Sequence, residues 1–411
     1  MFVKHALHTL FSRMTGVPFS VHYWNDEQYV YGTPDSQTPP SFTLYFRSEP
    51  SFDAADPMVT LGEAYMDGQF DIEGDWSALT TVMDKNRGLL HGKVARTASF
   101  LASAYDKLRQ KSQQKQNISH HYDIGNDFYA QWLDPTLSYS CAYFKYVDDN
   151  LETAQRQKIQ HCLNKLDLEP HHRLLDIGCG WGALLIAAAE QFGIRGVGLT
   201  LSKEQFKVAN QRIAERGLSE RIEVRLMDYL DLDGEREQFD RVVSVGMFEH
   251  VGEAHIPRFF DTLQRIMPEG GRMLLHSIMS HSDTPTNAWS DKYIFPGGEI
   301  PYQPRVFEIM AQKGFFLLGQ ESLRLHYART LDLWYQGFSK PDILAWSRQH
   351  YDERFVRMWM LYLQGCAASF RGAGLDVCQL IFTRGLNNQL PLTFASCYDG
   401  SQPERWGRSS I

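Results

Sequence analysis

Beyond residue 170, apolar residues occur in short runs separated by segments of helical spacing, which predicts alternating strands and helices. The helical segments are 181–192, 203–216 and 255–267, and a further helix is expected at 151–166, before the first strand. This alternation predicts an α/β fold with a mainly parallel sheet, covered on both faces, that binds ligands at the carboxyl ends of its strands. The expected strands are 173–178, 197–201, 222–226, 242–245 and 273–278, with a last strand at 377–382.

The N-terminal part of the chain has a different pattern, in which strand-like runs come before a helical stretch. It predicts a small α+β domain over residues 1–106. A polar, basic segment at 107–116 is expected to be a linker, and residues 117–411 are expected to form the second, larger domain. The elements expected in the first domain are strands at 29–32 and 42–46 and a helix at 76–86.

Two N-terminal segments allow both a structural and a membrane-contacting interpretation. Apolar residues recur at helical spacing within 2–14, which predicts a helix that packs on the domain core or, alternatively, lies on a membrane surface. The segment 107–116 contains four Lys and Arg residues, which are either simply solvated or close to anionic lipid headgroups.

The composition excludes several classes of protein. The chain has 49 Asp and Glu against 41 Lys and Arg, and its net charge of −8 argues against nucleic-acid binding. The six cysteines show neither a C-x-x-C pair nor metal-ligand spacing, so we expect reduced thiols, no metal site and a cytoplasmic protein. No apolar run approaches the length of a membrane span, and the N-terminal residues do not have the pattern of a signal peptide, so we expect neither feature.

The clearest chemical signal is a glycine-rich turn after the first expected strand, Asp176-Ile177-Gly178-Cys179-Gly180-Trp181-Gly182. A strand, a glycine-rich turn and a helix form a nucleotide-type cofactor site, because the missing Cβ atoms allow close approach to the backbone. The spacing Gly-x-Gly-x-Gly favours S-adenosylmethionine over a dinucleotide, since there is no pyrophosphate to bind. We expect Asp176 to hold the cationic methionine end of this cofactor.

Polar residues also follow the next two strands. The second strand ends at Thr200 rather than at the acid that usually holds a ribose, and Gln205 follows in the next helix. Both can form hydrogen bonds with a ribose or with the methionine part. Asp228 and Tyr229 end the third strand, where they can hold an adenine; alternatively, Tyr229 only packs on the surface.

Candidate substrate-facing residues follow the later strands. Glu249 and His250 end the fourth strand, where their side chains can reach a substrate. His276 lies in an apolar strand, and a single histidine in such a place is usually a hydrogen-bonded core residue. Tyr327 lies farther along the chain.

Six stretches spread over both expected domains resemble the cyclopropane-fatty-acid synthases, a family of S-adenosylmethionine-dependent enzymes. The stretches at 139–144 and 244–252 are specific to this resemblance, whereas the glycine turn at 175–182 is shared with many methyltransferases. The resemblance implies a Rossmann-like class I methyltransferase domain with a mainly parallel seven-stranded sheet, preceded by the small α+β domain. The remaining matching stretches are 62–68, 121–129 and 292–298.

The family's reaction, as the resemblance implies it, adds a methylene group across a cis double bond of an unsaturated acyl chain in a membrane phospholipid. The alkene attacks the sulfonium methyl, a bound bicarbonate removes a proton from the new methyl, and a cyclopropane ring closes. An alkene offers no polar group, so acceleration depends on positioning and on electrostatic stabilisation of the developing cation.

The same resemblance assigns roles to individual residues. His276, Tyr327 and the backbone N–H of Ile278 can donate to bicarbonate, and Glu249 can accept from its hydroxyl. The implied bicarbonate contacts are Cys141, Glu249, His276, Ile278 and Tyr327. The implied cofactor contacts are Tyr122, Tyr139, Ser140, Gly178, Gly180, Thr200, Gln205 and Tyr229.

Two further predictions concern a thiol and a group of aromatic residues. Cys366 matches a cysteine once proposed as catalytic in the family, but its helical, apolar neighbours favour a buried structural thiol. The rings of Tyr143, Phe144 and Phe248 either stabilise the cation or form the walls of an acyl pocket.

The sequence is therefore compatible with three functions. The favoured one is a cyclopropane synthase that acts on unsaturated phospholipids, associates peripherally with the inner face of the membrane and forms a homodimer, as the resemblance suggests. The second is a related enzyme that leaves a methyl or methylene branch on the acyl chain. The third is a non-catalytic lipid-binding protein with the same fold.

Overall fold

The computed structural model describes residues 2–33, 38–53, 56–90, 125–283, 287–401 and 405, so the predicted linker and Tyr122 lie outside the described residues. The chain forms two compact units. The first unit comprises Met1–Gln114, Thr286–Pro296 and Ala328–Leu375, and the second comprises Lys115–Pro285, Gly297–Tyr327 and Asp376–Ile411.

The first unit contains a four-stranded sheet in the order β2-β1-β3-β4. β1 pairs antiparallel with β2 and parallel with β3, and β3 pairs antiparallel with β4. The predicted strands at 29–32 and 42–46 correspond to β2 and β3, whereas β1 and β4 were not predicted. The strands are β1 (Phe19–His22), β2 (Gln28–Tyr31), β3 (Phe42–Phe46) and β4 (Phe70–Gly74).

The first helix, α1 (Phe2–Ser12), packs on this sheet. Leu7 and Phe11 are buried, and the Phe11 ring meets Phe19 of β1 edge to face at 6.0 Å. This confirms the prediction of a helix packed on the domain core. Phe2, at the start of the helix, is 89% exposed.

Helices from later in the chain complete the first unit. Arg357 of α16 donates to the carbonyl oxygens of Tyr65 and Phe70 at 2.5 and 2.8 Å, and these bonds join it to α2 and β4. This packing explains why the unit includes 328–375, which the prediction had assigned to the second domain. The helices of this unit are α2 (Pro57–Met66), α3 (Trp76–Lys85), α4 (Arg87–Leu90), α12 (Ala288–Tyr293), α15 (Pro341–His350) and α16 (Glu353–Gly372), together with α14 (Arg324–Phe338) from residue 328 onward.

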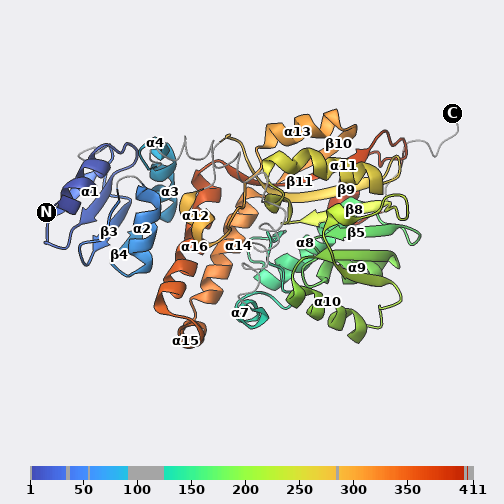
Figure 1. Ribbon diagram of the computed structural model, residues 1–411, viewed down its shortest axis with the longest axis horizontal. Coiled ribbons are helices and arrows are strands. Elements are labelled where there is room, and N and C mark those ends of the chain that lie inside the picture. The colour runs from blue at the N-terminus through green and yellow to red at the C-terminus, as the bar shows by residue number, and fades with distance from the viewer. Residues whose placement is uncertain are drawn as a thin grey trace. The chain divides into compact units, whose positions relative to one another are not determined.

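The second unit is built on a seven-stranded sheet in the order β10-β11-β9-β8-β5-β6-β7 (Figure 1). β5 pairs in parallel with both β6 and β8, β6 with β7, and β8 with β9, while β10 and β11 are antiparallel. The predicted mainly parallel seven-stranded sheet is confirmed. The strands are β5 (Arg173–Ile177), β6 (Arg195–Thr200), β7 (Ile222–Leu226), β8 (Arg241–Val245), β9 (Arg272–Ser280), β10 (Phe315–Ser322) and β11 (Leu375–Arg384).

Helices cover both faces of this sheet (Figure 1). Helices α8, α9 and α10 bury one apolar cluster against it, and α11 and α13 bury the other. They are α8 (Leu151–Leu166), α9 (Ala183–Phe192), α10 (Lys203–Glu215), α11 (Ile256–Ile266) and α13 (Gln303–Gln312). The shorter elements are α7 (Asn126–Ala130), η1 (Tyr229–Asp231), η2 (Phe248–His250), η3 (Glu253–His255) and α17 (Ala395–Asp399).

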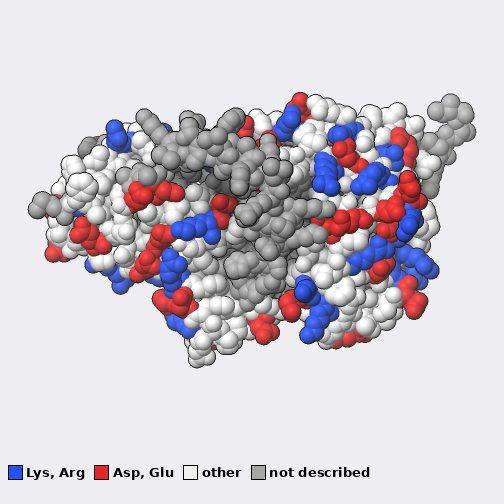
Figure 2. Space-filling model, in the orientation of Figure 1, with Lys and Arg blue, Asp and Glu red and all other residues white. Residues whose placement is uncertain are grey.

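Two surface properties of the described chain bear on possible partners. None of its helices combines the length and the apolar character needed to cross a membrane. Figure 2 shows acidic and basic side chains interspersed over the described part of the visible face. This distribution agrees with the net charge of −8.

Candidate active site

The glycine-rich turn leaves β5 at its carboxyl end and leads into α9. The backbone N–H groups of Gly178 and Cys179 both donate to the carbonyl of Leu199 in β6, at 3.0 and 2.9 Å. Gly180 has φ +55°, and a Cβ built on it would meet no described atom within 4 Å. The turn therefore presents backbone to open space, as a bound nucleotide-type cofactor requires.

Asp176 lies one residue before the end of β5, with only 3% of its surface exposed. Burial raises the pKa of its carboxyl to about 7, although the nearby Lys158 ammonium acts in the opposite direction. A buried acid of this kind favours a cationic partner. The site therefore fits the predicted role of Asp176 toward the methionine ammonium of S-adenosylmethionine.

Lys158 is a site residue that the sequence did not reveal. It lies on α8, is 4% exposed, and its ammonium donates to Ser140 Oγ at 2.9 Å. Ala154, Lys158 and Cys162 are spaced four residues apart and are all buried, so Lys158 lies on the apolar face of the helix. The sequence could have revealed Lys158, because a lysine on the apolar face of a predicted helix is buried, and a buried charge requires a polar partner.

Thr200 and Gln205 form a buried polar pair at the end of β6. The Thr200 hydroxyl donates to Gln205 Oε1 at 2.8 Å and accepts from the backbone N–H of Ser202 at 3.1 Å. This pair fixes the Gln205 amide so that its N–H₂ group remains as a donor. The geometry supports both residues as candidate cofactor contacts.

Asp228 and Tyr229 mark the end of β7. The Asp228 carboxylate accepts from the Leu230 N–H at 3.1 Å and caps η1. The Tyr229 ring meets the buried Phe259 edge to face at 5.4 Å, so it packs against the core rather than on the surface, where the alternative prediction had placed it. Contact of either residue with an adenine stays a prediction.

An aromatic cluster lies next to the glycine turn. The Tyr129 ring contacts Tyr139 at 5.1 Å and Trp181 of the turn at 5.8 Å. The Trp181 indole N–H also donates to Asn126 Oδ1 at 2.9 Å. These contacts hold the segment that contains Tyr139 and Ser140 against the turn, as expected for residues around one cofactor. Tyr122 lies outside the described residues.

Glu249 and Ile278 contact each other directly, so the Ile278 N–H that was predicted to donate to bicarbonate donates to a carboxylate instead. The Ile278 backbone N–H donates to Glu249 Oε1 at 2.6 Å. The other oxygen, Oε2, is buried and accepts no hydrogen bond from the described residues. Burial raises the pKa of Glu249 to about 7, against the effect of the Ile278 bond. The orphaned oxygen fits a ligand that has a hydroxyl donor, such as bicarbonate.

The other three predicted bicarbonate contacts lie near β9 and β11. His276 precedes Ile278 by two residues on β9, so both side chains face the same side of the strand. Cys141 Sγ approaches the Leu323 carbonyl at 3.8 Å, and the Tyr327 backbone N–H donates to the same carbonyl at 3.0 Å. The Leu323 carbonyl therefore lies between Cys141 Sγ and the backbone of Tyr327.

Cys366 is the remaining predicted catalytic residue, and its role stays a prediction. It lies on α16 in the first unit, whereas the five predicted bicarbonate contacts are all in the second. The residue is half-buried rather than fully buried, and burial raises the pKa of its thiol to about 12. A thiol with that pKa is a poor nucleophile near neutral pH.

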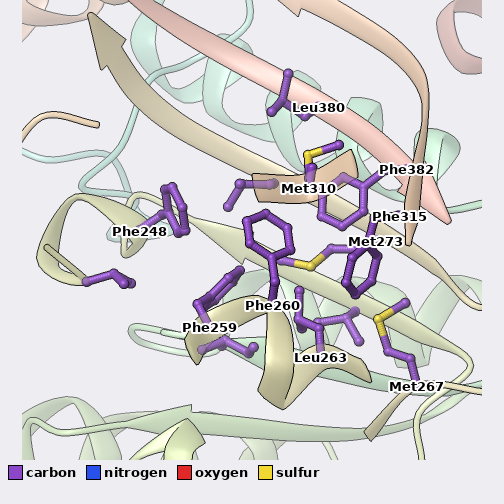
Figure 3. Close-up of a cluster of buried hydrophobic side chains, with 14 of the residues drawn as sticks. Phe248, Phe259, Phe260, Leu263, Met267, Met273, Met310, Phe315, Leu380 and Phe382 are labelled. Carbon is purple, nitrogen blue, oxygen red and sulfur yellow. The ribbon is translucent and has the colours of Figure 1, made fainter. Parts of the chain in front are cut away.

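Phe248 is a core residue. Its ring is fully buried and meets Phe259 at 4.9 Å, within the apolar cluster under α11 (Figure 3). Tyr143 is stacked between His161 at 4.1 Å and His326 at 5.0 Å. The Phe248 ring therefore packs in the core, and its contact with an acyl-chain cation stays a prediction.

The mainly parallel seven-stranded sheet and the glycine turn are together those of the Rossmann-like fold of S-adenosylmethionine-dependent methyltransferases. Residues 109–380 match the family model described as mycolic acid cyclopropane synthetase, and the chain belongs to this family. It is therefore a lipid-modifying, S-adenosylmethionine-dependent transferase. Residues 6–93 match a second model, described as a domain of unknown function.

Individual relatives agree with this assignment. The Escherichia coli K12 cyclopropane-fatty-acyl-phospholipid synthase is 37% identical over 80% of this chain and 84% of its own length. A probable fatty acid methyltransferase of Pseudomonas putida is 36% identical over 83% and 87%. The solved structure of mycolic acid cyclopropane synthase CmaA1 complexed with SAH and CTAB has a TM-score of 0.61 and 37% identity over 66% of this chain and 98% of its own.

Proposed function

We propose that this protein transfers a methylene group from S-adenosylmethionine to the cis double bond of unsaturated acyl chains in membrane phospholipids, forming a cyclopropane ring. The observation that carries the proposal is the buried Glu249 carboxylate, with one oxygen held by Ile278 and the other without a donor in the described chain. When bound, S-adenosylmethionine supplies the electrophilic carbon and bicarbonate supplies the base.

The protein's own residues have to position these groups and exclude water. The open face at Gly180 and the buried Asp176 provide contacts for the cofactor. Glu249 accepts the bicarbonate hydroxyl, while His276 and Tyr327 donate to its other oxygens, and all three side chains lie in the second unit. Holding the base in a fixed place lowers the entropy cost of proton removal.

A second candidate product is a methyl- or methylene-branched acyl chain. It is kept because the Pseudomonas relative, at nearly the same identity as the E. coli synthase, is described as a probable fatty acid methyltransferase. A cyclopropane forms when the transferred methyl loses a proton and the ring closes, whereas a branched chain forms without ring closure. Loss of the base would favour the branched product, but Cys141, Glu249, His276, Ile278 and Tyr327 are all present.

We also propose that the protein works as a homodimer on the inner face of the membrane, in the cytoplasm. Helix α1 turns Leu7 and Phe11 inward, so any contact of this helix with lipid would depend on the exposed Phe2. Flotation with vesicles of unsaturated phosphatidylglycerol, for the wild type and for Phe2→Ser, tests the lipid contact. Sedimentation tests the dimer.

The reaction itself is tested with vesicles of an unsaturated phospholipid and cofactor carrying a fully deuterated methyl group. Mass spectrometry of the released fatty acids should show loss of the double bond and retention of two of the three deuterons. Product that keeps all three deuterons would indicate a methyl branch, and product that keeps two but still carries a double bond would indicate a methylene branch. Absence of product, with folded protein and bound cofactor, would favour the lipid-binding function. Assays in bicarbonate-free buffer, with bicarbonate then restored, test the base.

A further inference from the structure

The ring of His276 is buried and faces a second buried side chain across the sheet. Its Nδ1 atom lies 3.0 Å from Nε2 of Gln379 on β11, and the two residues are 2% and 0% exposed. Burial lowers the pKa of His276 well below its ordinary value, so the neutral ring has one proton to place. The group that Gln379 presents to Nδ1 decides which ring nitrogen holds that proton.

Lys165 of α8 determines the orientation of the Gln379 amide. Its Nζ lies 2.5 Å from Gln379 Oε1, and an ammonium group can only donate hydrogen bonds. The amide oxygen must therefore face Lys165, which leaves the N–H₂ group facing His276. It follows that Nδ1 of His276 accepts a hydrogen bond and that the ring proton is on Nε2.

A third residue, Glu321, holds Lys165 in place. Glu321 on β10 is the cross-strand neighbour of Gln379, and its carboxylate contacts Lys165 Nζ and His161 Nε2, the latter at 2.6 Å. Burial alone would raise the pKa of Glu321, but the His161 bond and the Lys165 charge outweigh it and lower the pKa to about 2. Lys165 thus has an ionised partner on one side and the Gln379 oxygen on the other.

We infer that Lys165 and Gln379 fix His276 as the Nε2–H tautomer, so that its ring donates a hydrogen bond on the side opposite Gln379. The inference rests on the proposed function, because the acceptor of that bond is an oxygen of the bound bicarbonate. Lys165 and Gln379 are positioning residues that act through His276. Lys165 lies on helix α8 and Gln379 on strand β11, so the two residues connect that helix with the site. Val377, two residues before Gln379 on β11, accepts a hydrogen bond from the Leu323 N–H.

Gln379→Glu is the sharpest test, because it keeps the size of the side chain and replaces the donor that faces Nδ1 with an acceptor. The ring proton should move to Nδ1 and leave Nε2 bare. A histidine held in the wrong tautomer lowers kcat by about 10⁴ in a serine protease, so we expect turnover to fall at least 100-fold here, with unchanged cofactor affinity. The bicarbonate concentration for half-maximal rate should rise at least tenfold.

The tautomer is read directly from ¹⁵N chemical shifts of the histidine rings, with the His276 signals assigned by their loss in His276→Asn. Gln303→Glu is the matched control, since Gln303 is also a buried glutamine but contacts Cys378 Sγ at 3.4 Å. Gln379→Met, which neither donates nor accepts strongly, should give a mixture of tautomers and an intermediate rate. It also provides a second variant if Gln379→Glu does not fold.

A wild-type ring with its proton on Nδ1 would overturn the inference, as would a Gln379→Glu variant with a reversed tautomer and unchanged bicarbonate dependence. The tautomer is measured without substrate or bicarbonate, so this result does not depend on the proposed reaction. A wild-type enzyme that needs no bicarbonate would instead remove the proposed function, and with it the acceptor assigned to His276.

Discussion

The Ile278 backbone N–H donates to Glu249 Oε1 at 2.6 Å, and this bond aims a carboxylate whose second oxygen accepts nothing from the described chain. An unsatisfied buried oxygen costs about 1–3 kcal/mol, more when it is charged. Such a group persists when a bound ligand supplies the missing donor. The pair therefore connects the end of β9 with the chemistry proposed for the site.

Glu249→Gln should lower turnover by roughly 100-fold and leave cofactor affinity nearly unchanged, because the amide keeps the bond to Ile278 but replaces the ionised acceptor. Rates on phospholipid vesicles and calorimetry with S-adenosylmethionine measure the two effects. Glu253→Gln, the same substitution on an exposed residue nearby, is the control and should stay active. Equal losses of turnover and cofactor binding in Glu249→Gln would contradict the bicarbonate assignment.

The same variant should change how stability depends on pH. The pKa of Glu249 is raised from 4.5 to about 7 in the folded protein, so the unfolded chain loses this proton first as pH rises. Glu249 therefore makes the wild type progressively less stable between about pH 4.5 and 7, by at most about 3 kcal/mol, with no further change above that range.

Gln does not titrate, so Glu249→Gln should unfold at higher urea concentration than the wild type at pH 8 and at a similar concentration near pH 4.5. Other titrating groups, such as Asp176, are present in both proteins and largely cancel from the difference. A difference in unfolding free energy that does not vary with pH would show that Glu249 is not a buried acid. A Glu249→Gln variant that is inactive but more stable than the wild type would show that Glu249 serves activity and lowers the free energy of unfolding.

The parallel part of the large sheet was predictable because most of its strands are short apolar runs and helical segments separate several of them. β1 was missed because its four residues include Ser20 and His22. β4 was missed because its polar residues Asp71 and Glu73 alternate with apolar ones in a segment rich in turn signals. The membership of 328–375 in the first unit depends on contacts such as Arg357 with Tyr65, which no local pattern reveals.

The candidate site was predicted only in part, because a sequence reveals local motifs but not contacts between residues that are far apart along the chain. Motifs such as the glycine turn are local, and the resemblance supplied the expected roles of residues such as Glu249. The contact between Lys165 and Gln379 joins residues 214 positions apart, and neither lies in a matched stretch. The core position of Phe248 was missed because one aromatic residue in a motif gives no information on the direction of its ring.

Gly180→Ala should weaken binding of S-adenosylmethionine at least about tenfold, since the added Cβ would enter the space in front of the turn. Alanine at this positive φ also costs roughly 1–2 kcal/mol of stability. Gly217→Ala is a matched control, because Gly217 has φ +67° and its Cβ would likewise meet no described atom within 4 Å, but it follows α10. Both variants should lose similar stability, and equal loss of cofactor binding would contradict the assigned turn.

Cys366→Ser should keep turnover within about threefold of the wild type, because burial raises the pKa of the thiol to about 12 and makes it a poor nucleophile. Cys141→Ser should lose about tenfold, since Cys141 is one of the five proposed bicarbonate contacts. The measurement is the initial rate on vesicles, with circular dichroism to confirm folding. A folded but inactive Cys366→Ser variant would reverse the ranking of the two thiols.

Phe248→Ala tests whether the ring belongs to the core or to the substrate site. Removing a fully buried phenylalanine should cost about 3–5 kcal/mol of stability, and Phe260→Ala, in the same cluster but on α11, should cost a similar amount (Figure 3).

If Phe248 is only a core residue, the two variants should have similar turnover per folded molecule at a temperature where both remain folded. A ring that stabilised a developing cation would instead make Phe248→Ala selectively slow by tenfold or more, because a cation–π contact contributes up to about 2 kcal/mol when desolvated. Comparing the two rates after correction for the folded fraction separates these outcomes. Since the ring is fully buried within the core cluster, we expect the rates to agree.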